Sequence, residues 1–138
     1  MTELLKIEVP FLPPVEYSPN WRGHWAQRYK AGEEYSDAVY YYAIDARNRF
    51  YDKGLFLQFQ KACIDLTFVF PEERTRDQDN LIARFKPGLD ALVDSLILAG
   101  DDSEHLRIGA VTIEIDKDRA PLTIITLTEE LKELKTDI

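Results

Sequence analysis

The sequence predicts an α+β domain, with a small, mixed, mainly antiparallel sheet and helices packed on one face. Segments in which polar and apolar residues alternate, as they do in strands, occur near the start, in the middle and near the end of the chain. Two segments with helical spacing lie between them. The length of 138 residues is typical of one domain, so we expect residues 1–138 to form a single unit.

The first third of the chain predicts one strand and one helical region. Apolar and charged residues alternate over Leu4–Phe11, which predicts a strand that the following prolines end. From Trp21 to Tyr51 apolar residues recur at spacings of three and four, which predicts helix. Gly32 is expected to break this region into a short and a longer helix, and Asp52-Lys53-Gly54 is expected to end it.

The middle of the chain predicts a buried strand followed by a helix. Ala62–Phe70 is the clearest strand, and its alternate apolar residues are expected to share one face. Asp79–Leu98 has helical spacing, but Pro87 lies within it. Because proline lacks an N–H and restricts the preceding residue, either the helix is kinked at Pro87 or it begins near Arg84.

Two strands are expected near the end of the chain. Arg107–Ile115 and Leu122–Leu127 both alternate, and Lys117–Pro121 is expected to join them as a hairpin. Glu129–Lys135 is expected to be a short charged helix or a frayed tail.

Composition limits the possible functions. The formal net charge of −8 argues against indiscriminate binding to a polyanion, although residues 1–64 hold eight acidic and eight basic side chains. The sequence has no apolar run long enough for a membrane span and no signal-peptide pattern, so we expect a cytoplasmic protein without a membrane partner. Cys63 is the single cysteine, which excludes an internal disulfide and a multi-cysteine zinc site.

A helical wheel of the segment after Asp79 predicts two neighbouring stripes. The apolar stripe, expected to face the core, consists of Leu81, Phe85, Leu89, Leu92 and Leu96. The stripe beside it carries charge and consists of Asp79, Lys86, Asp90 and Asp94. A helix of this kind would display carboxylates and a lysine beside the core.

Acidic and basic residues gather around the same segment. Asp77 and Asp79 open it and Asp101-Asp102 close it, and the nearby cations are Arg74, Arg76, Arg84 and Lys86. Carboxylates beside cations suit a divalent metal that acts on a phosphodiester, because Mg²⁺ takes few protein carboxylates and leaves its other positions to water and phosphate. The alternative for Asp77 or Asp79 is a helix cap, and for Asp101-Asp102 a solvated turn.

A basic and aromatic segment follows the first prolines. Arg22, His24, Arg28 and Lys30 are candidates for DNA contacts, and Trp25 is a candidate to stack on an opened base. The alternative is that Trp25 belongs to the core of an amphipathic helix and the cations form its solvated face.

The order of these motifs resembles the RusA-type Holliday-junction resolvases. The similar segments are Arg76-Asp77-Gln78-Asp79-Asn80-Leu81, Lys86-Pro87-Gly88-Leu89-Asp90-Ala91-Leu92 and Gly100-Asp101-Asp102. Ser18-Pro19-Asn20-Trp21-Arg22-Gly23-His24-Trp25 is similar to the proline-asparagine loop of phage-type members of that family.

The resemblance implies a RusA-like fold and a Mg²⁺-dependent homodimer, with Mn²⁺ as a possible substitute, that makes paired symmetric cuts in four-way junction DNA during recombination and repair. It implies that Asp77 and Asp79 bind the metal together with Asp101 or Asp102, of which Asp102 is the better match. It also implies that Lys86 is the essential lysine, beside the catalytic carboxylates Asp77, Asp79 and Asp102.

Other interpretations remain open at this point. A non-catalytic module that binds nucleic acid or protein would suit the net charge of −8, and a Mg²⁺-dependent nucleotide phosphohydrolase would use similar residues. His105 follows the acidic pair and either approaches the metal or is salt-bridged or exposed. Tyr40-Tyr41-Tyr42 must place at least one ring outward on a helix and is a candidate dimer contact.

Overall fold

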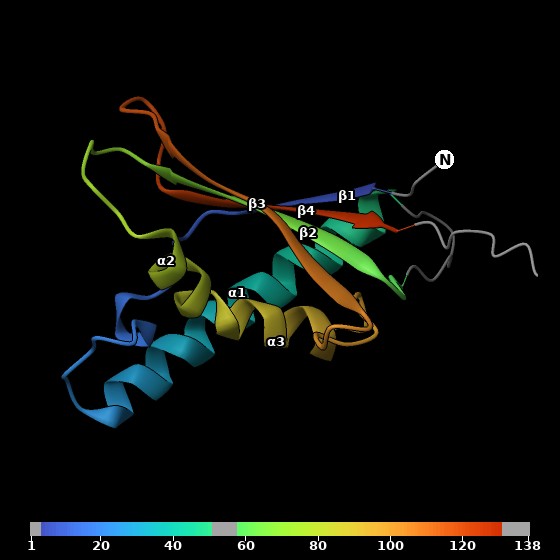
Figure 1. Ribbon diagram of the computed structural model, residues 1–138, viewed down its shortest axis with the longest axis horizontal. Coiled ribbons are helices and arrows are strands. Elements are labelled where there is room, and N and C mark those ends of the chain that lie inside the picture. The colour runs from blue at the N-terminus through green and yellow to red at the C-terminus, as the bar shows by residue number, and fades with distance from the viewer. Residues whose placement is uncertain (1–3, 51–57, 131–138) are drawn as a thin grey trace, which may run out of the picture.

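The computed structural model describes residues 4–50 and 58–130, which form three α-helices and a four-stranded sheet (Figure 1). The strands are β1 (Leu4–Val9), β2 (Ala62–Phe70), β3 (Leu106–Ile115) and β4 (Leu122–Glu129). The helices are α1 (Trp25–Phe50), α2 (Gln78–Arg84) and α3 (Lys86–Asp94), and a short 3-10 helix, η1 (Val15–Tyr17), precedes α1. The predicted α+β class is therefore confirmed.

The sheet has the strand order β1-β4-β2-β3. β4 pairs antiparallel with both β1 and β2, whereas β3 pairs parallel with β2, so the sheet is mixed and mostly antiparallel as predicted. The predicted hairpin at Lys117–Pro121 is wrong, because β2 lies between β3 and β4 and the connection must pass the end of β2. Strand order depends on non-local pairing, which the turn residues of that connection do not reveal.

The core lies between the sheet and the helices. Leu5, Ile7 and Val9 of β1 are fully buried, while the charged residues between them are exposed, as the alternation predicted. The predicted inward residues of β2 are also buried, and Phe68 packs edge-on against Phe85 between α2 and α3. Figure 1 shows α1 and α3 on the same side of the sheet.

The first helical region is one continuous helix, whereas the sequence predicted a short helix and a longer one. α1 runs without a break from Trp25 to Phe50, so the predictions of a start at Trp21 and a break at Gly32 are both wrong. Gly32 is buried, and a Cβ there would stand 2.3 Å from the Tyr17 ring, so the glycine permits a close approach of η1 to α1. The predicted end at Asp52-Lys53-Gly54 lies outside the described residues.

Two helices replace the single predicted helix over Asp79–Leu98. α2 ends at Arg84, and Pro87 lies in the first turn of α3, where an intrahelical donor is not required. Leu81, Phe85 and Leu92 are buried as the wheel predicted. Leu96 lies beyond α3 with a φ of 64° and is 54% exposed, so its predicted core position is wrong.

The end of the described chain also differs from its prediction. Glu129, expected to begin a helix or tail, is the last residue of β4 and accepts hydrogen bonds from the backbone N–H groups of Gln60 and Lys61. The rest of the predicted segment, 131–135, lies outside the described residues. None of the helices in 4–50 and 58–130 combines the length and the apolar character that a bilayer crossing requires.

Candidate functional site

Asp77 and Asp79 lie at the start of α2. Asp77 is the N-cap of this helix, and its Oδ1 accepts a hydrogen bond from the backbone N–H of Asp79 at 3.0 Å. The capping role is therefore confirmed for Asp77. Both side chains are exposed, and Asp79 lies in the first turn, where the helix dipole favours a negative charge. Capping uses one oxygen of Asp77 and leaves the other for a ligand.

The loop before α2 is fixed by Arg76. Its guanidinium lies 3.6 Å from the centre of the Phe70 ring and donates hydrogen bonds to the backbone oxygens of Glu72 and Arg74. The Arg74 side chain, by contrast, is exposed and forms no hydrogen bond or ion pair within the described residues. Of the two arginines expected to bind phosphate, Arg74 thus has its donors available, and Arg76 also holds the loop.

Arg84 joins α2 to the proline-rich segment that follows β1. Its Nη2 donates to Pro13 O at 2.6 Å and its Nε donates to Pro14 O at 3.3 Å. The side chain is partly buried, and this burial lowers the pKa of its guanidinium. Arg84 therefore acts in the described structure as a clamp on the N-terminal segment.

A second contact fixes the same segment to the acidic motif. The Ser18 hydroxyl donates to the Asn80 side-chain oxygen at 2.9 Å, and Asn80 follows Asp79 directly in α2. The sequence does not predict this contact, because no periodic pattern links residues 62 positions apart. The joint likeness of the two motifs to one family was the only signal that the two segments meet.

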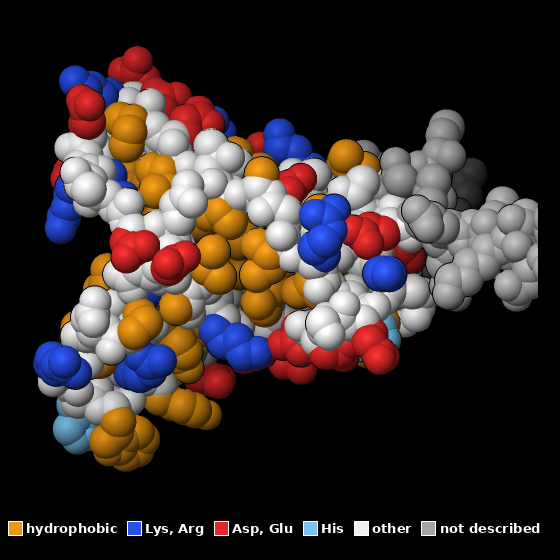
Figure 2. All heavy atoms as spheres, viewed as in Figure 1, with side chains coloured by type: hydrophobic (Ala, Val, Ile, Leu, Met, Phe, Trp, Pro, Cys, Tyr) orange, Lys and Arg blue, Asp and Glu red, His pale blue; other side chains and the backbone are white. Residues whose placement is uncertain are grey.

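The clamped segment and the loop before α2 enclose a cleft of about 540 Å³. Its polar lining consists of Glu72, Arg74, Thr75, Arg76, Asp77, Asn80 and Arg84, and its apolar lining includes Leu12, Pro13, Val15, Phe70 and Pro121. Figure 2 shows this end of the molecule hollowed, with acidic side chains at the position of α2. Carboxylate, amide and guanidinium groups thus share one concave surface.

Lys86 lies at the start of α3 between two carboxylates. Its Nζ lies 2.8 Å from Asp101 Oδ2 and 2.9 Å from Asp90 Oδ1. The hydrogen bonds that Lys86 donates to Asp101 and then to Asp90 raise the pKa of the lysine, and the contact with Lys86 lowers the pKa of Asp101. An ammonium group has three N–H donors, so two are used here and one is left for an incoming acceptor.

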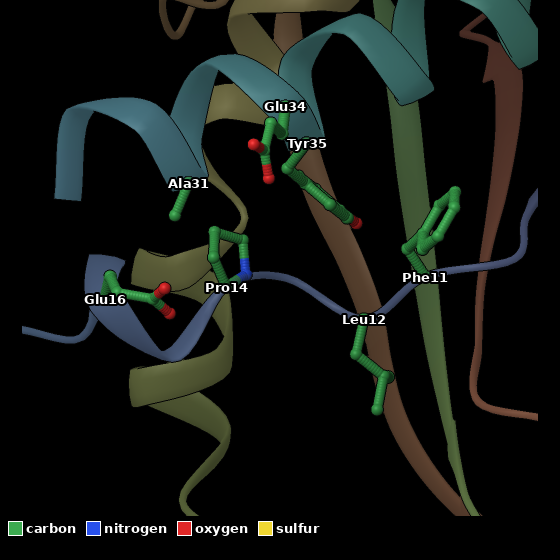
Figure 3. A pocket seen from close by; sticks show the side chains of 7 residues that line it. All are labelled: Phe11, Leu12, Pro14, Glu16, Ala31, Glu34 and Tyr35. Atoms are coloured by element: carbon green, nitrogen blue, oxygen red, sulfur yellow. The ribbon is translucent and has the colours of Figure 1, made fainter. Parts of the chain in front are cut away.

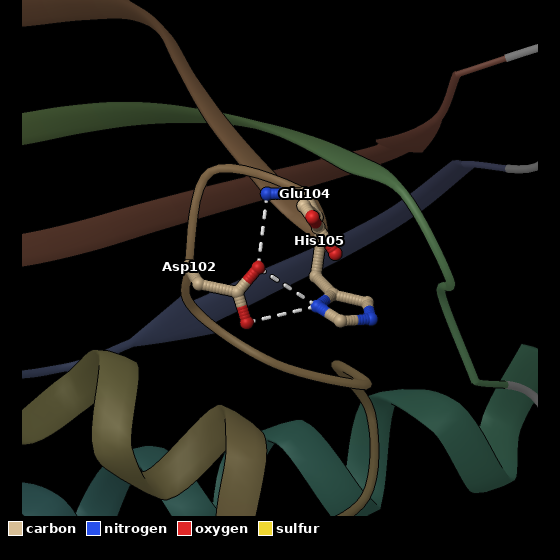
Figure 4. A network of polar contacts seen from close by, with 3 residues as sticks. All are labelled: Asp102, Glu104 and His105. Atoms are coloured by element: carbon tan, nitrogen blue, oxygen red, sulfur yellow. Dashed lines mark hydrogen bonds and ion pairs between the residues drawn. The ribbon is translucent and has the colours of Figure 1, made fainter.

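Asp102 forms a local network with His105 (Figure 4). Its Oδ1 accepts the backbone N–H of Glu104, and both oxygens lie 2.9 Å from His105 Nδ1. The hydrogen bond with His105 lowers the pKa of Asp102. The structure therefore places Asp101, and not the better sequence match Asp102, beside Lys86, while His105 is paired with Asp102.

The donor set for a metal is smaller than the resemblance implies. Within 4–50 and 58–130, no group of three or more His, Cys, Asp or Glu side chains stands close enough to hold a metal ion. Asp77 and Asp79 remain as two exposed hard-oxygen donors, a number that suits a Mg²⁺ ion with water and phosphate as its other ligands. Asp101 is paired with Lys86, and Asp102 is paired with His105.

The basic segment before and within the start of α1 divides into two kinds of residue. Arg28 lies 4.2 Å from the centre of the Tyr17 ring and donates to the backbone oxygens of Glu16 and Ser18, so it holds η1 against α1. Arg22 and Lys30 are exposed, and their side chains form no hydrogen bond or ion pair in the described part of the chain. Trp25 is 72% exposed, so its alternative assignment to the core is wrong.

A smaller pocket lies between the proline-rich segment that follows β1 and helix α1 (Figure 3). It measures about 330 Å³ and is lined by Phe11, Leu12, Pro14, Glu16, Ala31, Glu34 and Tyr35. The buried Tyr35 hydroxyl donates to Thr123 Oγ1, which in turn donates to Phe11 O. Burial raises the pKa of Tyr35, so this hydroxyl stays protonated. Tyr35 thus attaches α1 to Thr123 of β4, and Thr123 attaches the segment that contains Phe11.

Comparison with known proteins gives one relative. A Xylella fastidiosa protein described as uncharacterized is 32% identical over 117 residues, which cover 84% of this chain and 71% of the relative. No family model matches the chain.

Proposed function

The chain belongs to the same family as the uncharacterized Xylella fastidiosa protein, and since that description names no activity, we propose a function from the site. We propose that the protein is a Mg²⁺-dependent, structure-specific endodeoxyribonuclease of RusA type with a RusA-like fold. Its substrate is four-way junction DNA, which a homodimer resolves by paired symmetric cuts. The observation that carries this proposal is the cleft where Asp77 and Asn80 face Arg74, Arg76 and Arg84.

The cleft and the start of α2 beside it combine two complementary groups of residues, which suits a phosphodiester. Asp77 lines the cleft, whereas Asp79 lies in the first turn of α2 outside its lining. Asp77 and Asp79 would hold the Mg²⁺ ion, which when bound polarises the scissile phosphate and lowers the pKa of a water ligand. Arg74 binds a neighbouring backbone phosphate with donors that no residue of the described chain occupies. Arg76 and Arg84 keep the two walls of the cleft in place and add positive charge.

Lys86 contributes charge and does not act as a base. Its raised pKa keeps the amine protonated at neutral pH, so it has no lone pair with which to accept a proton. The donor that Asp90 and Asp101 leave unused stabilises negative charge that develops on the phosphoryl or leaving oxygen. Asp101 and Asp90 orient the ammonium group for this contact.

A second candidate is a non-catalytic module that binds nucleic acid or protein. It is favoured by the net charge of −8 and by the third expected metal carboxylate, which is paired with Lys86 or His105. In this case the same cleft would bind a phosphate group without cleaving a bond.

Junction cleavage distinguishes the candidates. The protein is incubated with a labelled synthetic four-way junction and with linear duplex, first in Ca²⁺ and then after a change to Mg²⁺. Paired nicks in the junction alone, in Mg²⁺ alone, support the nuclease. Junction binding that never leads to nicks supports the binding module, and phosphate release from a nucleotide without DNA would instead indicate a phosphohydrolase.

A further inference from the structure

The start of α1 carries exposed aromatic side chains that the proposed cleavage site does not use. Trp25 is 72% exposed and Tyr29 is 61% exposed, one helical turn apart on the same face. The His24 ring stacks on Trp25, with ring centres 5.6 Å apart and an angle of 29° between the planes. We call His24, Trp25 and Tyr29 the aromatic platform.

The segment that carries the aromatic platform is basic, in contrast to the chain as a whole, and it ends at the exposed acidic pair Glu33-Glu34 one turn further along α1. Residues 18–32 contain three basic side chains and no acidic one, while the net charge of the protein is −8. Arg22 and Lys30 are exposed, with donors that no described residue occupies. Figure 2 shows hydrophobic, histidine and basic side chains together at the end of the molecule where α1 begins. An anionic partner with flat apolar groups matches this surface.

The aromatic platform is also attached to the candidate site. It follows Ser18, which binds Asn80 of α2, and Arg28 holds the intervening segment through two backbone oxygens. Trp21 is partly buried and its ring carbon would meet a Cβ on Gly23 at 2.1 Å, so the turn into α1 is closely packed. The aromatic platform therefore keeps a defined position relative to Asp79.

We propose that the aromatic platform stacks on unpaired bases of the DNA substrate, while Arg22 and Lys30 bind the adjacent phosphates. This inference rests on the proposed function and adds to it the form of the substrate. The DNA that the site accepts carries splayed, single-stranded nucleotides next to the strand that enters the cleft. Stacking on aromatic rings suits this partner because it tolerates any base sequence.

Tryptophan fluorescence tests the stacking directly and needs no cleavage. A Trp21→Phe variant leaves Trp25 as the single tryptophan, since the chain has two. Titration with an oligo-dT of about 15 nucleotides in Ca²⁺ is expected to quench its emission, whereas linear duplex quenches it much less. Trp25→Ala in the otherwise unchanged chain is expected to bind oligo-dT about 5- to 100-fold more weakly, and Trp25→Phe is expected to retain most of the affinity.

The matched control is Tyr41→Ala. Tyr41 is 64% exposed on the same helix but lies outside the basic segment, so this variant should bind oligo-dT like the unchanged protein. Absence of Trp25 quenching, or equal affinity for Trp25→Ala, would overturn the inference. A change of Trp25→Ala from dimer to monomer with unchanged affinity for oligo-dT would also overturn it, in favour of an interface between copies of the chain.

Failure of this inference is distinguishable from failure of the proposed function. Junction cleavage without quenching of Trp25 overturns the stacking and leaves the nuclease. Quenching by oligo-dT in a protein that never cleaves a junction supports the stacking and contradicts the nuclease.

Discussion

The hydroxyl of Ser18 donates a hydrogen bond to the side-chain oxygen of Asn80 at 2.9 Å, although the two residues are 62 positions apart. This contact joins the segment before α1 to the helix that carries Asp79. The contact therefore fixes the aromatic platform relative to the acidic motif, and these two features form the two ends of the candidate DNA surface.

Ser18→Ala is expected to lower the free energy of unfolding by about 0.5–1.5 kcal/mol, because it removes a partly buried hydrogen bond. Urea unfolding of Ser18→Ala, Asn80→Ala and the double variant measures the coupling between the residues. We expect a coupling energy of at least about 0.5 kcal/mol. Strictly additive losses would show that the contact does not stabilise the protein in solution.

Arg84→Met is expected to destabilise the protein by about 1–3 kcal/mol. The substitution keeps an apolar stem but removes the donors to Pro13 O and Pro14 O, which hold the N-terminal segment against α2. Urea unfolding measures the loss, and Arg22→Met is the control because Arg22 is exposed and has no described partner. The control should stay within about 0.5 kcal/mol of the unchanged protein, and an equal loss in both variants would contradict the clamp.

Lys86→Met is expected to slow junction cleavage about 10²- to 10³-fold, because it removes the charge and the unused donor offered to the phosphate. Stability should change by less than about 1 kcal/mol, since the side chain is half-exposed and its ion pairs are near the surface. Asp90→Asn is the control, because it removes one ion pair and keeps the contact of Lys86 with Asp101. A Lys86→Met protein that cleaves as fast as the unchanged protein would show that Lys86 takes no part in cleavage.

The ion pair between Lys86 and Asp101 predicts a specific dependence on pH. The lysine lowers the folded-state pKa of Asp101 below its ordinary value of 3.8, so the carboxylate binds protons less readily in the folded than in the unfolded chain. The stability that this pair contributes is therefore present above the unfolded pKa and is lost as the pH falls through the folded pKa. Because the pair is partly exposed, its contribution at pH 7 is up to about 1 kcal/mol.

Urea unfolding of the unchanged protein and of Asp101→Asn checks this dependence. The difference between them should be present at neutral pH and should disappear below the folded pKa of Asp101. Asp94→Asn serves as the control at neutral pH, where the loss of this exposed side chain should change the free energy of unfolding by less than about 0.5 kcal/mol. A difference for Asp101→Asn that persists at low pH would show that the variant acts through something other than the ion pair.

Local patterns predicted the strands well, for a physical reason. β1 and β2 bury alternate residues, so the alternation in the sequence identifies the residues that face the core, such as Leu5, Ile7, Ile64 and Phe68. The sequence did not predict that β2 lies between β3 and β4, because strand pairing depends on contacts between residues far apart in the chain. Gly32 was misread because its role depends on Tyr17, a neighbour in space that no helical spacing reveals.

The candidate site was predicted in part. The sequence placed Asp79, Lys86, Asp90 and Asp94 on one charged stripe. The structure places Lys86 against Asp90 as one turn of α3 requires, but Asp79 lies in the separate helix α2. The sequence did not distinguish Asp101 from Asp102, because the direction of each side chain depends on how the loop before β3 turns. The structural roles of Arg28 and Arg84 were also missed, since backbone oxygens of distant prolines and turns leave no sequence pattern.

Junction cleavage by Asp79→Asn shows whether Asp79 is a catalytic carboxylate of a nuclease. The control is Asp94→Asn, because Asp94 lies on the same predicted charged stripe but at the far end of α3. On a labelled four-way junction in Mg²⁺, Asp79→Asn is expected to cleave at least about 100-fold more slowly than the unchanged protein while it still binds the junction in Ca²⁺. Asp94→Asn is expected to cleave at the unchanged rate, and full cleavage by Asp79→Asn would contradict the account.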